Sequence, residues 1–248
     1  MLKYAAAAPA VLGLSSVAAT LTAPTARASA IAGRTVFLDP GHNGAKDASI
    51  NRQVTNGRGG PKECQTTGTT ADSGFPEHSF NWDVVLRIRA ALTAYGVRTA
   101  MSRGNDNALG PCVDQRAAMA NALHPDAIVS IHADGGPPDG RGFHVNYSSP
   151  PLNDAQSGPA MRLAEMMRDQ LLAAGFMPST YRGSDGLYDR ADLAGLNLAQ
   201  YPSILIELGN MKNQQEAAAM TAAEGRAKYA AAVAQGIATY LSQRHGTT

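Results

Sequence analysis

Short runs of apolar and β-branched residues alternate with longer amphipathic stretches along most of this chain, and this alternation limits the fold more than any other feature. The runs predict strands at 35–38, 97–101, 127–131, 142–147 and 204–208. The stretches predict helices at 79–95, 114–123, 158–174, 213–221 and 223–243. Strands that alternate with helices of this length predict one α/β domain whose sheet carries helices on both faces.

Two local features refine this prediction. Residues 43–76 are rich in Gly, Asn, Thr, Arg and Pro and show little periodicity, so we predict a long ordered loop there. Loops of this length are unusual in compact domains and often carry function. We also expect Asp114 to be the N-cap of the helix that follows it.

The first thirty residues differ from the rest of the chain. A short basic start, an alanine-rich apolar run and small residues that permit cleavage after Ala28 or Ala30 are typical of a secretory signal peptide over residues 1–30. The alternative is a membrane anchor, but a span needs about 20 mostly apolar residues and this run is diluted by Ser, Thr and Pro. We therefore expect residues 31–248 to be exported to the periplasm or cell wall, without membrane contact after cleavage.

The chain has two cysteines, Cys64 and Cys112. In an oxidising compartment a lone pair most simply forms one disulfide. A zinc-binding pair is the alternative, but the two residues lack the C-x-x-C spacing.

The net charge of the chain bears on its binding partners. With 21 basic and 20 acidic side chains the formal charge is +1, which gives no reason to expect nucleic acid or an acidic membrane surface as a partner.

Four residues are candidates for chemistry. His42 and His132 follow predicted strands, Glu207 lies inside an apolar strand, and Glu77 lies near a helix start. Taken singly, a histidine at a strand end is more often structural, and a glutamate at a helix start usually complements the helix dipole. Glu207 is harder to dismiss because a carboxylate among apolar residues needs a partner. Two histidines and a carboxylate form a common catalytic zinc set, and a further carboxylate can act as general base.

Spacing alone does not prove such a site, because the chain has no His-Glu-x-x-His motif. Six segments, however, follow one another in a recognisable order. They are the Val-Phe-Leu-Asp-Pro-Gly-His run at 36–42, Glu77 with Asn81, Ser102-Arg103 with Asp106, Arg116 with Ala120-Asn121, the Ser-Ile-His-Ala run at 130–133, and segment 202–213. In this order they resemble the motifs of the zinc-dependent N-acetylmuramoyl-L-alanine amidases of the Amidase_3 type.

The resemblance implies a single domain with a mixed, mainly parallel sheet. It implies that His42, Glu77 and His132 bind a zinc ion, Zn2+, and that Glu207 is the general base. The implied reaction cleaves the amide bond between N-acetylmuramic acid and L-alanine, in peptidoglycan or in muramoyl-peptide fragments, and nothing requires more than a monomer. One departure is His144, which stands where the family commonly has Glu.

Two other functions remain open. A zinc peptidase that cuts within the stem peptide could use the same ligand set, and only the motifs argue against it. A non-catalytic wall-binding protein with a dead amidase fold is the second alternative, although a dead copy would be expected to have lost one of the four site residues.

Overall fold

The computed structural model describes residues 30–243, so the expected signal peptide at 1–30 lies almost wholly outside the described residues. Its central sheet has the strand order β4-β1-β5-β8-β6-β7. In that order the strands span Arg98–Met101, Thr35–Pro40, Ala127–Asp134, Ser203–Asn210, His144–Ser148 and Leu187–Arg190. The first four are parallel to one another, β6 runs antiparallel to β8, and β7 runs parallel to β6. The prediction of a mixed, mainly parallel sheet is confirmed.

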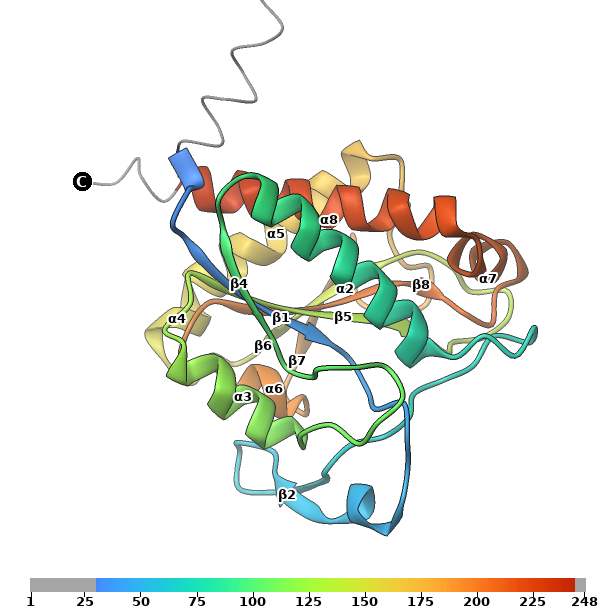
Figure 1. The fold of residues 1–248 in the computed structure, drawn as a ribbon, viewed down its shortest axis with the longest axis horizontal. Helices are drawn as coiled ribbons and strands as arrows, with labels where there is room; N and C mark the ends of the chain where they lie inside the picture. The colour runs from blue at the N-terminus through green and yellow to red at the C-terminus, as the bar shows by residue number, and fades with distance from the viewer. Residues whose placement is uncertain (1–29, 244–248) are drawn as a thin grey trace, which may run out of the picture.

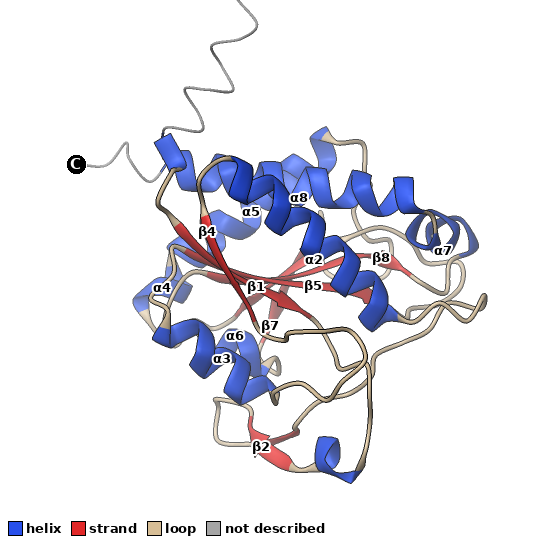
Figure 2. Cartoon of the chain, in the orientation of Figure 1, coloured by secondary structure: helices blue, strands red, loops and turns tan. Residues whose placement is uncertain are grey.

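Helices cover both faces of this sheet (Figures 1 and 2). On one face lie α2 (Glu77–Ala94), α5 (Pro159–Ala173) and α8 (Ala223–Gln243), with α7 (Gln214–Thr221) beside α8. On the other lie the shorter α3 (Val113–Ala122) and α6 (Ala194–Asn197), while α4 (Asp154–Ser157) leads into α5. Within residues 30–243 no helix is both long and apolar enough to cross a membrane.

The two faces of the sheet differ in what they pack against. Val129 and Ile131 of β5, with Ile204 and Ile206 of β8, are fully buried in the main core with α2, α5 and α8. Side chains alternate between faces along a strand, so the residues between them point the other way. On this second face α3 and α6 cover only part of the sheet, and polar side chains of β5 and β8, including His132, line an open cleft.

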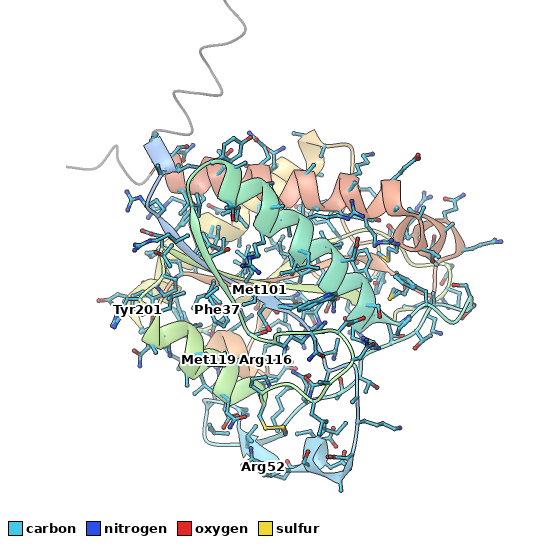
Figure 3. The ribbon with its side chains drawn as sticks, viewed as in Figure 1. Phe37, Arg52, Met101, Arg116, Met119 and Tyr201 are labelled. Atoms are coloured by element: carbon cyan, nitrogen blue, oxygen red, sulfur yellow. A yellow bond between two sulfur atoms is a disulfide. The ribbon has the colours of Figure 1, made fainter. Side chains whose placement is uncertain are left out.

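Segment 43–76 is more structured than the predicted loop. It contains a 3-10 turn, η1 (Ala48–Asn51), and a two-stranded hairpin of β2 (Gln53–Thr55) and β3 (Pro61–Glu63). These elements are too short to leave a periodic pattern in the sequence. Cys64, directly after β3, forms a disulfide with Cys112, as expected; it is the yellow bond near Arg52 in Figure 3.

Two predicted helix starts need correction. Helix α3 begins at Val113 with Cys112 as its N-cap, so the expected cap at Asp114 is wrong. The backbone N–H of Cys112 donates to Gln115 Oε1 at 2.9 Å, a link that fixes this start. Helix α2 begins at Glu77, two residues before the predicted start, and places this carboxylate in its first turn.

Candidate metal centre

Three elements bring His42, Glu77 and His132 together. His42 follows the end of β1 and has a backbone φ of 66°, in the left-handed region. Glu77 is the first residue of α2, and its backbone N–H donates to Thr69 O at 3.0 Å. His132 lies near the carboxyl end of β5, where ligands gather in parallel sheets. The structure thus places all three sequence-predicted ligands at one point.

Their donor atoms form a nearly equilateral triangle. His42 Nε2 is 3.0 Å from Glu77 Oε1, and His132 Nδ1 is 3.1 Å from each of them. A tetrahedral zinc ion with ligand distances of about 2.0 Å separates its ligands by roughly 3.3 Å. Three lone-pair donors this close to one another need a shared cation or protons between them. The residues present therefore fit a zinc ion with one open coordination position.

Neighbouring loop residues orient this triangle. Thr66 Oγ1 lies 2.8 Å from His42 Nδ1, the ring nitrogen that faces away from the other ligands. Glu77 Oε2 accepts a hydrogen bond from Thr69 N at 2.9 Å, and Oε1 accepts one from Ala133 N at 3.1 Å. Such outer partners fix the orientation of metal ligands. Neither threonine was a sequence candidate, because single threonines in a polar loop carry no distinctive signal.

The ionisation of Glu77 also suits a metal ligand. Burial alone raises the pKa of this carboxyl. The opposing charges and hydrogen bonds of His42 and His132 outweigh it and hold the pKa of Glu77 far below its usual range. The Glu77 side chain, with its lowered pKa, is therefore an anionic donor at neutral pH.

Arg116 of α3 holds the turn that carries His42. Its Nη2 donates to the carbonyl oxygen of His42 at 2.8 Å and to Asn43 Oδ1 at 2.7 Å. Its Nη1 donates to Asp39 Oδ1 at 2.8 Å and to Pro40 O at 2.9 Å. The planar guanidinium thus spans four groups of one chain segment, which a lysine ammonium has too few donors to do.

Arg103 joins the same turn to the start of α2. It donates from Nε to Pro40 O at 3.0 Å and from Nη2 to His78 O at 2.7 Å. His78 follows Glu77 directly, so Arg103 connects the segments of two ligands. Both arginines belong to motifs of the resemblance, but their bridging role is visible only in the folded structure.

Two glycines leave room for the ligands. A Cβ atom on Gly41 would lie 2.2 Å from the imidazole of His132. A Cβ on Gly68, whose φ is +77°, would lie 2.5 Å from Glu77 Oε2 and 2.7 Å from His42 Cδ2. Gly68, like Thr66 and Thr69, is a site residue that sequence reasoning missed.

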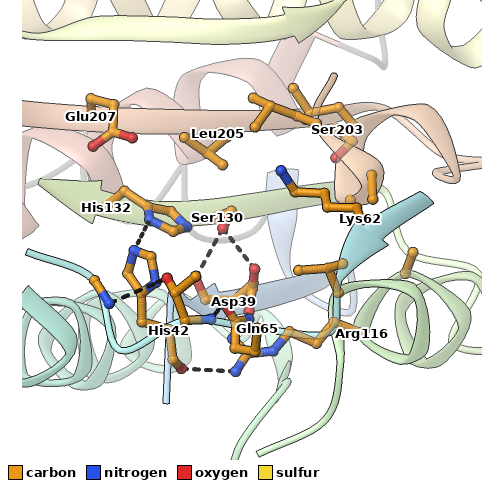
Figure 4. A pocket seen from close by; sticks show the side chains of 18 of the residues that line it. Asp39, His42, Lys62, Gln65, Arg116, Ser130, His132, Ser203, Leu205 and Glu207 are labelled. Atoms are coloured by element: carbon orange, nitrogen blue, oxygen red, sulfur yellow. Dashed lines mark hydrogen bonds and ion pairs between the residues drawn. The ribbon is translucent and has the colours of Figure 1, made fainter. Parts of the chain in front are cut away.

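Glu207, the fourth predicted residue, lies beside the triangle but outside it. In the register of the parallel strands β5 and β8, Glu207 is the partner of His132. Figure 4 shows its carboxylate turned toward the His132 ring. Its Oε2 is buried and has no hydrogen-bond partner among residues 30–243. Burial, and then the negative charges of Glu77 and Asp134, raise the pKa of Glu207 well above its usual value.

A cleft of about 670 Å³ runs from this centre along the sheet (Figure 4). Asp39, Ser130 and Leu205 of the sheet line its floor, together with residues of α3 and α6. The hairpin segment supplies Lys62 and further residues as a wall. Part of the segment 51–74 therefore borders the cleft.

Comparison with known proteins shows the family of this chain. The N-acetylmuramoyl-L-alanine amidase family (Amidase_3) matches residues 36–239. The N-acetylmuramoyl-L-alanine amidase Rv3717 of Mycobacterium tuberculosis is 63% identical over 234 residues, which cover 94% of this chain and 97% of that protein.

Solved structures agree as well. The crystal structure of the N-acetylmuramyl-L-alanine amidase Ami1 of Mycobacterium smegmatis is 70% identical and superposes with a TM-score of 0.85, over 85% of this chain and 98% of that one. The N-acetylmuramoyl-L-alanine amidase AmiC2 of Nostoc punctiforme is 26% identical with a TM-score of 0.64, over 84% and 97% of the two chains. The chain belongs to the Amidase_3 family of N-acetylmuramoyl-L-alanine amidases.

Proposed function

We propose that this amidase cleaves the bond between N-acetylmuramic acid and the L-alanine of the stem peptide with one zinc ion, held by His42, Glu77 and His132, and with Glu207 as general base. The observation that carries this proposal is the triangle of donor atoms at 3.0–3.1 Å, with Glu207 in register beside His132. Zinc commonly binds such nitrogen and oxygen donors and leaves a position open for water in hydrolytic sites.

When bound, zinc supplies a Lewis acid that polarises the scissile carbonyl and makes a bound water more acidic. Glu207 takes a proton from the water that attacks this carbonyl. It then delivers the proton to the nitrogen of L-alanine as the carbon–nitrogen bond breaks. The products are a lactyl carboxylate on the sugar and a peptide with a free amino terminus. A base with a raised pKa suits this role, because it must take up and return a proton near neutral pH.

The cleft supports an extended substrate. The cleft extends along the sheet from the His42–Glu77–His132 triangle and so has room for groups next to the scissile amide. We propose peptidoglycan or muramoyl-peptide fragments as the substrate and a monomer as the active form. No further domain is needed for this chemistry, since all four residues lie within residues 31–248.

We also propose that residues 1–30 are a signal peptide and that the protein acts in the periplasm or cell wall. The alanine-rich start with its small-residue cleavage sites supports export. The Cys64–Cys112 disulfide supports it independently, because disulfides persist mainly in oxidising compartments.

The test uses the mature chain, loaded with zinc, and a muramoyl peptide whose products are followed by mass spectrometry. Wild type should release an intact peptide with a free L-alanine amino terminus. Glu207→Gln should keep one zinc per chain and lose turnover, whereas His42→Ala should lose both. His124→Ala, at a histidine that is not among the residues lining the cleft, should change neither. Cleavage within the peptide would instead identify a stem-peptide peptidase, and near-normal rates in Glu207→Gln would refute the base assignment.

A further inference from the structure

His144 lies directly opposite Glu207 in the sheet. Strands β6 and β8 are antiparallel, and their register pairs His144 with Glu207. In an antiparallel pair, opposed residues point to the same face, with Cβ atoms about 4.5–5.5 Å apart. Strand β8, which carries Glu207, lies between β5 and β6 in the sheet. His132 of β5 and His144 of β6 therefore lie on opposite sides of Glu207.

Both side chains have a buried polar atom without a partner. His144 is only 2% exposed, and its Nδ1 has no hydrogen-bond partner among the described residues. The same holds for Oε2 of Glu207. Buried polar atoms without a partner are rare in native proteins, and each calls for an explanation. Here one atom can donate as N–H, the other is a carboxylate acceptor, and they belong to neighbouring side chains.

The surroundings keep this imidazole neutral. The rings of Tyr181 and Tyr188 pack edge-on against His144, with centroids at 6.4 and 5.7 Å. Burial is the largest cause that lowers the pKa of His144; together with the charges of Arg190 and Arg182, and against the opposing charge of Asp134, it brings this pKa to about 4. A neutral imidazole carries one N–H donor and one acceptor nitrogen.

The same charged groups surround Glu207. Asp134 of β5, Arg190 of β7 and Arg182 of the loop before β7 act on both His144 and Glu207, and Glu77 of α2 acts on Glu207 as well. The two side chains therefore share one electrostatic environment, in which no described group donates a hydrogen bond to Glu207 Oε2.

We propose that His144 is a positioning residue for the general base: its neutral imidazole donates a hydrogen bond from Nδ1 to Oε2 of Glu207, directly or through one water molecule. This contact leaves Oε1 free to face the His42–Glu77–His132 triangle. It also stabilises the carboxylate form of Glu207 against the burial and negative charges that oppose it. The inference rests on the proposed role of Glu207 as base.

The first test compares two substitutions in the zinc-loaded enzyme. Asn at position 144 keeps an N–H donor near the place of Nδ1, whereas Phe keeps the ring shape without a donor. We expect His144→Phe to lower kcat about tenfold or more, the range typical of weakened acid–base catalysis, with KM nearly unchanged. We also expect its acid limb of kcat to move to higher pH. His144→Asn should retain most of kcat and the wild-type limb.

The control is Tyr188→Phe, which keeps the ring against His144 and removes only a hydroxyl; it should leave kcat and its pH profile unchanged. Zinc content and melting temperature are measured for every variant. If His144→Phe and His144→Asn lose activity equally, with equal loss of melting temperature, His144 only packs and the proposal is wrong. An unchanged pH profile in His144→Phe would overturn it too.

A second test does not depend on turnover. The ¹⁵N spectrum of the His144 imidazole in the zinc-loaded protein at pH 7 should show Nδ1 protonated, and this resonance should shift in Glu207→Gln. Protonation at Nε2 instead would overturn the proposal. The two proposals can fail separately. If Glu207→Gln remains active, Glu207 is not the general base. If Glu207→Gln is inactive but the His144 variants keep wild-type kcat and pH profile, only the proposed role of His144 is wrong.

Discussion

The guanidinium of Arg116 donates to the backbone carbonyl of His42 at 2.8 Å, so helix α3 holds in place the first of the three proposed metal ligands. His42 has a φ of 66°, a conformation that costs a non-glycine residue about 1 to 3 kcal/mol. It persists because the contacts around it determine the turn. The ligand geometry therefore depends on a residue that lies 74 positions away in sequence.

Replacing Arg116 by Lys should weaken zinc binding and the fold together. Lysine keeps the charge but cannot donate at once to Asp39, Pro40, His42 and Asn43. Because a buried acceptor that loses its hydrogen bond to a charged donor is costly, we expect a loss of about 3 kcal/mol in the free energy of unfolding. Denaturant unfolding and zinc titration against a chelator measure the two effects. Arg87→Lys, at a half-exposed helix pair, should cost less than about 0.5 kcal/mol and leave zinc affinity unchanged.

Asp39 should give the fold part of its acid sensitivity. Burial raises the pKa of this carboxyl, but the charge of Arg116 and hydrogen bonds from Ser102 and Ser130 outweigh it and lower the pKa from 3.8 to about 2. A depressed folded-state pKa stabilises the fold at pH values above 3.8. That contribution, about 2 kcal/mol, is lost as the pH falls from about 4 to about 2.

The measurement follows unfolding free energy of zinc-free protein at several pH values, for wild type and for Asp39→Asn. The difference between the two should shrink as the pH falls through this window. Asp169→Asn, which removes an exposed charge, should show no such convergence. A difference that stays constant between pH 4 and pH 2 would contradict the assignment to Asp39.

Much of the fold could be predicted from the sequence, because its strands and helices have distinct periods. Helix α8 has the predicted bounds, since its apolar stripe is long and unbroken. The short elements β2, β3 and β7 were missed, because three or four residues are too few to show a period. The antiparallel direction of β6 has no local signal either; only the family resemblance implied a mixed sheet.

The four predicted site residues lie close together in the structure. Their proximity was implied by the order of the family motifs and not by the spacing of the residues in the sequence. Glu77 shows why: at a helix start it is indistinguishable from an ordinary dipole-complementing residue. Only the fold shows that Thr69 and Ala133 donate to its carboxylate from two other segments. The pairing of His144 with Glu207 likewise depends on strand register, which no single strand encodes.

Gly68→Ala should disturb two of the proposed metal ligands directly. Its Cβ would lie 2.5 Å from Glu77 Oε2 and 2.7 Å from a ring carbon of His42, so one or both ligands must move. Gly59 is a matched control in the same segment: its φ is +84°, close to the +77° of Gly68, but a Cβ there would meet nothing within 4 Å. Both alanine variants should lose about 1 kcal/mol of stability through backbone strain. Only Gly68→Ala should also lose zinc affinity, by about tenfold or more. Equal zinc affinities in the two variants would mean that the ligands tolerate the added methyl group.

Two sets of contacts hold the hairpin that forms one wall of the cleft, and we expect the removal of each to have a different effect. Cys64–Cys112 closes a loop with a sequence separation of 48, worth about 4 kcal/mol on the chain-entropy model. At the hairpin tip, Arg58 donates to Asn197 Oδ1 and to Ser148 Oγ, each at 3.0 Å.

Replacing both cysteines by alanine should lower the melting temperature by roughly 10 °C, because the unfolded chain gains the entropy that the bridge removed. It should also raise KM, because Lys62 and its neighbours on the freed hairpin line the cleft. Arg58→Met loosens the tip and leaves the bridge intact, so it should raise KM with a smaller loss of stability. Melting curves and steady-state kinetics on one muramoyl peptide separate the two effects. If KM stays at the wild-type value in both variants, the hairpin borders the cleft without contacting the substrate, and its role is confined to the stability of the fold.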